Sequence, residues 1–310
     1  MILTITLNAA IDKRYVVAGS RPGEVNRVQE CSYTPGGKGL NVSKPVKIAG
    51  AEIIATGFVG GNAGNYIVEQ LKELGIASDF YHVKEESRSC INIWDMVAHT
   101  QTEFLEPGFA VQSEDLEGFI DKFQGLIKTA EVVVMSGSAP RGVDANIYRR
   151  MIPMVKSIGK KVILDSSGEF LSEGIRSCPT MIKPNIDEIR FLTGLPCNTK
   201  EEIIQAAIKI HEKGIAMVVV SLGGAGSILV CEEGVYVATI PKIQVVNTVG
   251  CGDAMIAGFA ISLEEKLGRE ESLRRASAIS AASALGRETG FFRIEDMQKL
   301  SPQIKIEKWK

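Results

Sequence analysis

An aspartate follows two glycines where an apolar helix is expected to begin, in the last quarter of the chain. The segment Thr248–Gly258 reads TVGCGDAMIAG and contains Gly250, Cys251, Gly252 and Asp253. The first amides of a helix lack intrahelical partners and the helix dipole adds positive potential, so a developing phosphate charge could be held there. Asp253 could then act as a base, although an aspartate at this position could equally be present to cap the helix.

A second glycine-rich segment follows a short apolar run. Ser221–Gly226 reads SLGGAG, and its amides could wrap the phosphates of a nucleotide. A plain β-turn fits these residues equally. Neither glycine segment completes a dinucleotide-binding fingerprint, because Met255 stands where the third glycine belongs. Gly37-Lys38 is not a P-loop either, because Gly39 replaces the required Ser or Thr.

Two oxygen-bearing side chains stand three residues apart in the segment Lys183–Glu188. On a helical turn, Asn185 and Glu188 would share one face. Oxygen ligands so spaced suit magnesium held partly through water. A capping box, with Asn185 as the cap and Glu188 at the third position, fits the same letters.

The N-terminal part carries polar groups suited to a sugar. Asp12 follows the first apolar run, and Pro35–Asn41 is a glycine-rich bend that contains Lys38 and opens a helix. A carboxylate and an amide facing this bend could bind hydroxyl groups. Arg27 and Arg88 could bind a phosphate, because the guanidinium forms a planar fork of donors, although each alone is more often a solvated surface residue.

The elements that must position these groups alternate in type. Near-continuous apolar runs predict strands covered on both faces at Ile53–Val59, Val132–Met135, Lys161–Leu164, Met181–Ile182 and Met217–Val220. Helical spacing appears between them at Gly64–Leu74, Leu116–Ile127, Ile147–Val155, Glu202–His211 and Leu273–Leu285. This alternation predicts an α/β sandwich with a mostly parallel sheet, and ligands in such sheets bind beyond the carboxyl ends of the strands.

Two stretches break the alternation. Residues 13–33 and 90–104 read as short, polar-interleaved strands without an intervening helix, and we expect a small separate β-sheet that acts as a lid. The organisation predicted for residues 1–310 is therefore one α/β domain with this lid.

Composition narrows the function further. The net charge of -2 and the lack of long single-sign runs give no reason to expect nucleic acid or a membrane surface as a partner. The 6 cysteines are scattered and the 3 histidines lie far apart, so neither a zinc cluster nor a serine–histidine hydrolase is expected. The N-terminus reads as a strand, which predicts a cytoplasmic protein. Glycines interrupt the uncharged segment Gly214–Cys231, which predicts two buried strands rather than a membrane helix.

Taken together and in this order, the motifs resemble the ribokinase-type (PfkB) carbohydrate kinases. The resemblance runs from Ile2 to Gly290, with signature regions at Gly36–Gly50 and Asn247–Gly258. It leans toward the phosphosugar branch, which contains tagatose-6-phosphate kinases and 1-phosphofructokinases. The segments that carry this leaning are Val25–Arg27, Gly36–Asn41, Thr56–Gly61, Ser136–Ser138, Asp165–Gly168, Ile182–Asn185 and Val220–Gly223. Two further segments, Arg88–Ile91 and Ile240–Asn247, lean toward the tagatose-6-phosphate members.

The resemblance implies a three-layer ribokinase-like sandwich, ATP as the phosphoryl donor and Mg²⁺ as its counter-ion. It assigns Asp253 as the catalytic base, in a bend formed by Gly250, Cys251 and Gly252. It assigns to the phosphosugar Asp12, Arg27, Gly37, Lys38, Asn41, Arg88 and Ser138. It assigns to the nucleotide Lys183, Asn185, Ser221, Gly223, Gly226, Thr248, Gly250 and Gly252, and to the metal, through water, Asn185 and Glu188.

Some residues depart from the family pattern. Ala9 replaces a usual proline, Ala139 a common leucine and Cys251 an alanine. Pro45 lies inside the helix expected after Lys38, which should start late or kink there. We therefore expect phosphorylation of a ketohexose monophosphate, preferentially tagatose 6-phosphate, to a 1,6-bisphosphate. The alternatives are phosphorylation of fructose 1-phosphate and, more remotely, a non-catalytic sugar- or nucleotide-binding regulator. A homodimer is also considered.

Overall fold

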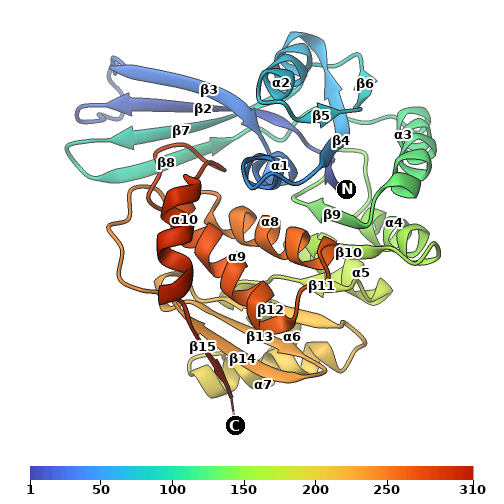
Figure 1. Ribbon diagram of the computed structural model, residues 1–310. Helices are drawn as coiled ribbons and strands as arrows, with labels where there is room; N and C mark the ends of the chain where they lie inside the picture. The colour runs from blue at the N-terminus through green and yellow to red at the C-terminus, as the bar shows by residue number, and fades with distance from the viewer. Residues whose placement is uncertain (310) are drawn as a thin grey trace.

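Two sheets of unequal size organise the chain (Figure 1). The computed structural model describes residues 1–309. The larger, 11-stranded sheet runs β15-β14-β13-β12-β11-β10-β9-β1-β4-β5, with β6 paired to β4 off this path. Strands β1, β4 and β9 to β12 pair in parallel, whereas β12 to β15 pair antiparallel.

The strands of the larger sheet are mostly short. Their bounds are β1 Ile2–Thr6, β4 Ile53–Gly60, β5 Ala77–Ser78, β6 Tyr81–Val83, β9 Val132–Ser136, β10 Lys161–Asp165, β11 Met181–Ile182, β12 Met217–Ser221, β13 Ser227–Cys231, β14 Gly234–Thr239 and β15 Lys305–Lys308. The α-helices are α1 Lys38–Ile48, α2 Gly61–Glu73, α3 Ser113–Leu126, α4 Ile147–Lys156, α5 Gly168–Gly174, α6 Ile186–Thr193, α7 Lys200–His211, α8 Cys251–Glu264, α9 Arg269–Ser283 and α10 Ile294–Leu300.

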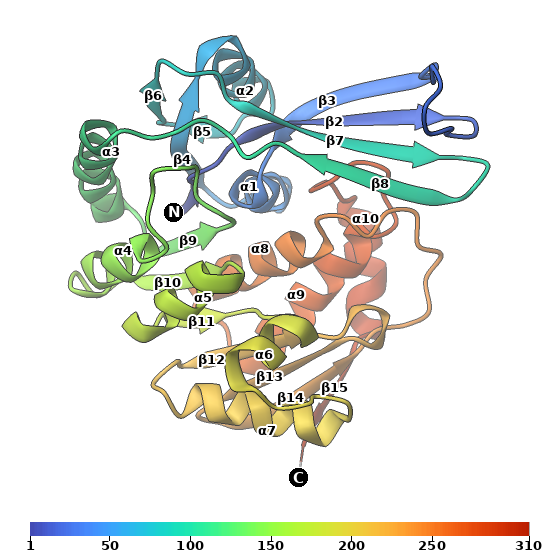
Figure 2. The same ribbon diagram turned by 180° about the vertical axis from the view of Figure 1, so that it is seen from behind.

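Helices cover both faces of the larger sheet and create two apolar cores (Figures 1 and 2). Side chains alternate between the faces of a strand, so Ile2 of β1 enters one core and Leu3 the other. One core receives side chains from α1, α2, α8 and α9, and the other from α3, α4, α6 and α7. The continuous apolar runs in the sequence reflect this double coverage.

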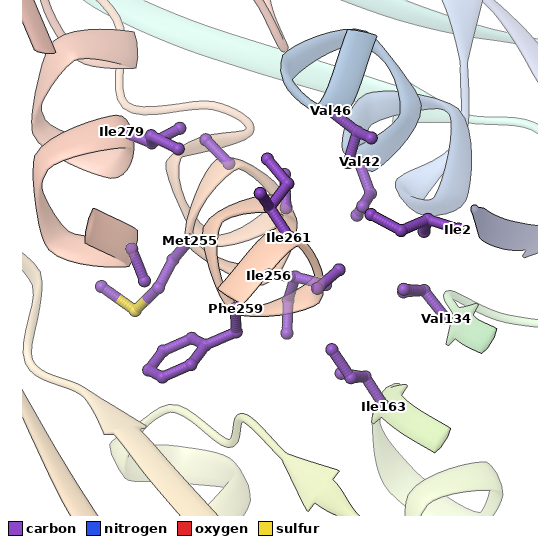
Figure 3. Packing of buried hydrophobic residues seen from close by; sticks show 14 of the residues in the cluster. Ile2, Val42, Val46, Val134, Ile163, Met255, Ile256, Phe259, Ile261 and Ile279 are labelled. Carbon is purple, nitrogen blue, oxygen red and sulfur yellow. The ribbon is translucent and has the colours of Figure 1, made fainter. Parts of the chain in front are cut away.

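Helix α8 occupies the centre of the first core. Figure 3 shows its Ile256 and Phe259 among side chains from α1, α9 and strands β1, β9 and β10. A Cβ built on Gly258 would lie 2.5 Å from the Cα atom of Ala276 on α9, so a side chain there would separate the two helices. Because α8 is buried along its length, its N-terminus is held firmly at the edge of the sheet.

The predicted α/β sandwich is confirmed, and the predicted strands and helices lie within a few residues of the observed bounds. Residues Gly214–Cys231 contain β12 and β13, which pair antiparallel around the glycine turn, as expected. Among the described residues, no helix combines the length and apolar character that crossing a membrane requires.

Of the two outcomes expected of Pro45, a late start of the helix or a kink, α1 does not show the late start. The helix begins at Lys38 and contains Pro45 in its interior. Because proline has no N–H, the carbonyl of Asn41 loses the helical hydrogen bond it would otherwise accept. The backbone of Gly290 approaches this carbonyl, and a Cβ built on Gly290 would lie 3.1 Å from the carbonyl oxygen. The loop that precedes α10 therefore covers the position that Pro45 opens.

The second sheet contains β2 (Ala10–Val17), β3 (Glu30–Gly36), β7 (Arg88–Asp95) and β8 (Thr100–Leu105), in the order β3-β2-β7-β8. We call it the lid sheet. It extends away from the larger sheet, with its turns at the far end (Figures 1 and 2). Its strands come from the two segments predicted to form a lid, with β2 and β7 beginning earlier than expected and β3 ending later.

One carboxylate ties the two turns at the far end of the lid sheet together. Asp95 is 5% exposed and accepts hydrogen bonds from the backbone N–H groups of Gly19 (3.1 Å), Ser20 (2.6 Å), Val97 (2.9 Å) and Ala98 (3.1 Å). These bonds hold the pKa of Asp95 at about 2, below its ordinary value, because they favour the charged form. The β2–β3 connection is thereby fixed to the end of β7.

We predict that Asp95→Ala accelerates amide hydrogen exchange at the far end of the lid sheet and leaves the larger sheet unchanged. Four amides lose their acceptor, whereas the strand ladders stay intact. Exchange measured by NMR at residues 19, 20, 97 and 98 tests this. Asp95→Asn keeps one carbonyl acceptor and should fall between the parent and the alanine variant. Unchanged exchange at all four amides in the alanine variant would contradict the prediction.

Candidate active site

The predicted site residues gather at the carboxyl ends of the parallel strands. Ser138 follows β9, Asp165 ends β10, Lys183 follows β11 and Ser221 ends β12. Strand β1 pairs with β4 on one side and β9 on the other, so the strand order changes direction at β1. Open α/β sheets bind their ligands at such a point, and the lid sheet begins there at Ala10.

Helix α8 points an uncapped N-terminus into this site. Its N-cap is Gly250, at a φ of 80°, and no side chain accepts hydrogen bonds from its first amides. A Cβ built on Gly250 would lie 2.7 Å from the methyl carbon of Thr289, so this position requires glycine for both conformation and space. Asp253 lies in the first turn and does not cap the helix, which removes the capping explanation for it. The free amides can bind an anion.

Two lysines flank a second buried carboxylate, Asp165. Lys183 Nζ lies 3.5 Å and Lys38 Nζ 3.8 Å from Asp165 Oδ1. A Cβ built on Gly252 would lie 3.2 Å from Lys183 Nζ, so this ammonium group stands directly over the first turn of α8. Both oxygens of Asp165 are buried without a hydrogen-bond partner in the part of the chain that the structure describes. The lysines and the α8 amides therefore concentrate positive charge at one point.

The surroundings of Asp253 bring the pKa of its carboxyl group close to neutral pH. Burial raises the pKa of Asp253 to about 7, and the negative charge of Asp165 adds to this effect. The ammonium groups of Lys38 and Lys183 and the amide of Asn41 lower it. A carboxyl group with a pKa near 7 suits a general base, since it accepts a proton readily and is still ionised at neutral pH. Asp165 in turn raises the pKa of Lys38 to about 12.

The residues predicted for the sugar lie at the base of the lid sheet. The carboxyl carbon of Asp12 would lie 2.1 Å from a Cβ built on Gly36, so Asp12 covers the glycine bend that leads into α1. Burial raises the pKa of Asp12, whereas Lys44, Arg88 and the Asn41 amide lower it. The Asn41 amide thus lies beside both Asp12 and Asp253.

Other predicted sugar residues take up their places around this amide. Gly37 is the N-cap of α1 at a φ of 97°, and Lys38 is the first residue of that helix. A Cβ built on Gly137 would lie 3.5 Å from the Cβ of Lys38, which places Lys38 against the turn after β9. Ser138 is exposed in the same turn. The structure therefore brings these residues to one side of Asp253.

The two arginines predicted for the substrate phosphate are not brought together. Arg88 starts β7 at the base of the lid sheet and donates from Nε to Asn8 O (3.1 Å) and from Nη1 to Glu106 O (2.9 Å). Arg27 is exposed in the β2–β3 connection at the other end, and β2 alone spans roughly 23 Å between these ends. Only Arg88 is therefore close to Asp12, whose pKa its charge lowers.

A cavity of about 770 Å³ lies between the base of the lid sheet and the first turn of α2. Arg88 is the one residue that it shares with the predicted site, and its lining also includes Lys13, Asn62, Tyr66 and Gly108. Asp253 is not among the lining residues, so this cavity is separate from the predicted catalytic base.

The residues predicted for the nucleotide come from the ends of β11 and β12 and from the loop before α8. Asn185 forms a parallel β-bridge with Ser221, which joins the ends of β11 and β12. Gly223 begins a short 3-10 helix and Gly226 closes the turn, where a Cβ would lie 2.0 Å from Ala238 O. Thr248 accepts a hydrogen bond from Cys251 N (3.3 Å) through its carbonyl and lies in the loop before α8. These residues line a strip from β12 to α8.

Asn185 and Glu188 form a capping box on α6. Asn185 Oδ1 accepts from Glu188 N (2.8 Å), and Glu188 Oε2 accepts from Asn185 N (2.9 Å). Glu188 Oε1 has no hydrogen bond within residues 1–309, and its charge acts on Lys38, so Glu188 faces the site. Glu188 Oε1 and the unpartnered oxygens of Asp165 are hard ligands of the kind magnesium prefers. The residues present fit a magnesium ion held partly through water.

Sequence reasoning assigned no role to Asp165 or Lys44. Asp165 lies at the end of a buried strand, and an acidic residue at that position is a signal that could have been used. Lys44 falls among apolar residues of α1 and gave no such signal, because only the folded chain buries it.

Comparison with known proteins agrees with this geometry. The family model described as pfkB family carbohydrate kinase matches residues 3–296, and the chain belongs to this family. The predicted resemblance is therefore confirmed, and the protein is an ATP-dependent sugar kinase whose fold is that of sugar-phosphate kinases.

Solved structures of similar proteins span the whole chain. A Staphylococcus aureus protein proposed to be a phosphofructokinase is 29% identical, with a TM-score of 0.85, and the match covers 100% of this chain and 99% of that one. A Thermotoga maritima protein proposed to be a 1-phosphofructokinase is 26% identical, with a TM-score of 0.88 and the same coverage. Phosphofructokinase-2 from Escherichia coli in complex with fructose 6-phosphate is 25% identical, with a TM-score of 0.90, over 97% and 98% of the two chains.

We predict that Asp253→Asn stabilises the protein above pH 7 and has no effect on stability below about pH 4. The folded-state pKa of about 7 lies above the ordinary value of 3.8, so the folded parent binds a proton more tightly than the unfolded chain. Its stability therefore falls as the pH rises from about 4 to 7, and the neutral asparagine removes this loss.

Urea unfolding at pH 4, 6 and 8 measures the effect. The exposed Asp144→Asn serves as the control for removal of a surface carboxylate. An Asp253→Asn variant that is less stable than the parent at pH 8 would show that the folded site favours the charged carboxylate.

Proposed function

We propose that the protein transfers the γ-phosphoryl group of ATP to a hydroxyl group of a ketohexose monophosphate, preferentially tagatose 6-phosphate, and produces a 1,6-bisphosphate. The observation that carries this proposal is Asp253, a buried carboxyl group beside the uncapped N-terminus of α8. Lys38 and Lys183 flank the same point. Phosphoryl transfer needs positioning and charge neutralisation more than covalent chemistry, and this site supplies both.

Each group has a defined part in the reaction. Asp253 accepts the proton of the attacking substrate hydroxyl while the oxygen of that hydroxyl bonds to the γ-phosphorus. At the same time the bond between the γ-phosphorus and the β–γ bridging oxygen breaks. The amides of Gly252 and Asp253 in the first turn of α8 stabilise charge on the transferring group, because they are fixed before the reaction and have no other partner among the described residues. Lys183, which lies over Gly252, and Lys38 add positive charge there. ADP leaves with the bridging oxygen.

Magnesium would be held by Asn185 and Glu188 through water, and the buried oxygens of Asp165 offer further hard ligands. When bound, such an ion neutralises phosphate charge and orients the donor. The capping box fixes Glu188 on the first turn of α6, so its remaining oxygen keeps a constant direction.

The choice of substrate rests on the base of the lid sheet. Arg88 uses two of its N–H groups on backbone carbonyls, so its guanidinium is held rigidly and retains donors for a phosphate. Asp12 and Asn41 lie near it and suit hydroxyl groups. Phosphorylation of fructose 1-phosphate is the alternative, because it needs the same kinds of contact. A purely regulatory protein is disfavoured, since Gly250, Gly252 and Asp253 are all intact.

We also propose a homodimer located in the cytoplasm. The lid sheet and its turns expose apolar side chains that a second copy could cover, namely Val25, Val28, Tyr33, Met96, Val97, Phe104 and Leu105. The E. coli phosphofructokinase-2 has also been described in a tetrameric inhibited form. The cytoplasmic location stays a prediction from the sequence, supported by six cysteines that are all free thiols.

Turnover with a panel of sugars tests the function. With ATP and Mg²⁺, we expect the highest kcat/KM for tagatose 6-phosphate, a lower value for fructose 1-phosphate, and little turnover of free tagatose or fructose. We expect Asp253→Asn to bind ATP normally by calorimetry and to lose about 10²- to 10⁴-fold in kcat, the usual contribution of a positioned base. Turnover of the asparagine variant within a few-fold of the parent, or a preference for free sugars, would refute the proposal.

Arg88→Ala is expected to weaken binding of the substrate phosphate specifically. Loss of a charge-assisted hydrogen bond costs about 1.5 to 3 kcal/mol, which corresponds to a rise of about 10- to 150-fold in KM for the phosphosugar. The KM for ATP and any residual turnover of the free sugar should stay close to the parent values. Equal losses with the phosphorylated and the free sugar would instead show that Arg88 only supports the local fold.

A further inference from the structure

Lys44 is a buried cation for which the proposed reaction gives no role. It lies on α1 and is 1% exposed. Its Nζ donates to Asn41 Oδ1 (3.1 Å) and to the backbone carbonyl of Thr289 (3.3 Å), and it stands 5.6 Å from the centre of the Phe291 ring. Burying an ammonium group carries a large cost unless its surroundings compensate. A methionine would fill this space without that cost, so the positive charge needs an explanation.

The first contact determines how the amide of Asn41 is oriented. An ammonium group can only donate hydrogen bonds, so it fixes the oxygen of Asn41 on its own side. The NH₂ group of Asn41 must then point away from Lys44. That direction leads to Asp12 and Asp253, and the Asn41 amide lowers the pKa of both carboxyl groups. Lys44 thus decides which end of Asn41 faces the base and the carboxylate predicted to bind the sugar.

The second contact reaches the other side of the site. Thr289 belongs to the loop 286–292, and its methyl group packs against Gly250 at the N-cap of α8. The next residue, Gly290, covers the Asn41 carbonyl that Pro45 leaves without a helical partner. Lys44 therefore joins α1 to a loop that packs against Gly250, the N-cap of α8. The Lys44 ammonium group thus contacts both Asn41, which is predicted to bind the sugar, and Thr289, which packs against the N-cap of α8.

We propose that Lys44 is a positioning residue that aligns the substrate hydroxyl with Asp253, by fixing the Asn41 amide and by holding the loop 286–292 against Gly250. The proposal rests on the proposed function, because it assigns Asn41 to the sugar and Asp253 to the base. Lys44 does not touch the reacting atoms. It acts through Asn41 and Thr289.

The charges around Lys44 make the proposal measurable by pH. The acidic groups that face it are Asp12 from β2, Asp253 from α8 and Glu288 from the loop. Burial lowers the pKa of Lys44 to about 8, and these three groups oppose that effect. A neutral side chain at this position would remove positive charge near Asp253 and release the Asn41 amide. Both changes raise the pKa of Asp253 and move the rising limb of the pH–rate profile upward.

Lys44→Met is the principal variant, and Lys47→Met, at an exposed lysine on the same helix, is its matched control. We expect Lys44→Met to fold with somewhat lower stability than the parent, because Asn41 Oδ1 and Thr289 O lose a donor while the cost of burying the ammonium group is removed. Its kcat should fall by about 10²-fold, as expected when a reacting group is slightly misplaced. The rising limb of kcat against pH should move up by about 1 pH unit. Lys44→Arg should recover most of both effects, and Lys47→Met should show neither.

A readout without substrate separates this inference from the proposed function. The pKa of Asp253 is obtained from the pH dependence of the stability difference between parent and Asp253→Asn, measured with and without Lys44→Met. We expect a higher pKa with Lys44→Met, even if no sugar in the panel is turned over. If Lys44→Met does not fold, Lys44→Gln replaces it with the same expectations. A folded neutral variant with the parent's pKa for Asp253, kcat and pH profile would overturn the inference.

Discussion

The burial of two carboxyl groups beside two ammonium groups, at the carboxyl ends of the central strands, is the constraint on which the site depends. Asp165 and Asp253 are buried and repel one another, and Lys38 and Lys183 offset this repulsion. The arrangement is stable only because the surrounding elements are rigid. Helix α8 is buried along its whole length, and continuous apolar strands hold Asp165 and Lys183 in place. The two apolar cores therefore hold the charged groups of the site in fixed positions.

Much of the fold could be predicted from the sequence because double coverage of a parallel sheet leaves a strong local signal. Runs such as Val132–Met135 are apolar at every position, and β9 is found there. The start of α1 was harder to predict, since the cost of Pro45 inside a helix is a local rule that tertiary contacts overrode. Gly290 covers the carbonyl that proline leaves free, and no local pattern announces a contact between residues so far apart.

The site could be predicted only in part, for a related reason. Glycines and the aspartate at Gly250–Asp253 form a contiguous pattern, so their proximity needed no folding to be seen. The separation of Arg27 from Arg88 and the burial of Lys44 depend on which strand pairs with which. Sequence letters alone do not carry that information. Asn185 and Glu188 show a further limit, because one pair of side chains satisfies both a capping box and the chemistry of a metal ligand.

The hydrogen bonds to Asp95 make this carboxylate take up a proton at a much lower pH than Asp253 does. The carboxylate that joins the two turns of the lid sheet has a pKa of about 2, whereas the base has a pKa of about 7. Between these values the base takes up a proton while the far end of the lid sheet keeps its hydrogen bonds. Mild acid therefore protonates the proposed base and leaves the carboxylate that joins the two turns of the lid sheet charged.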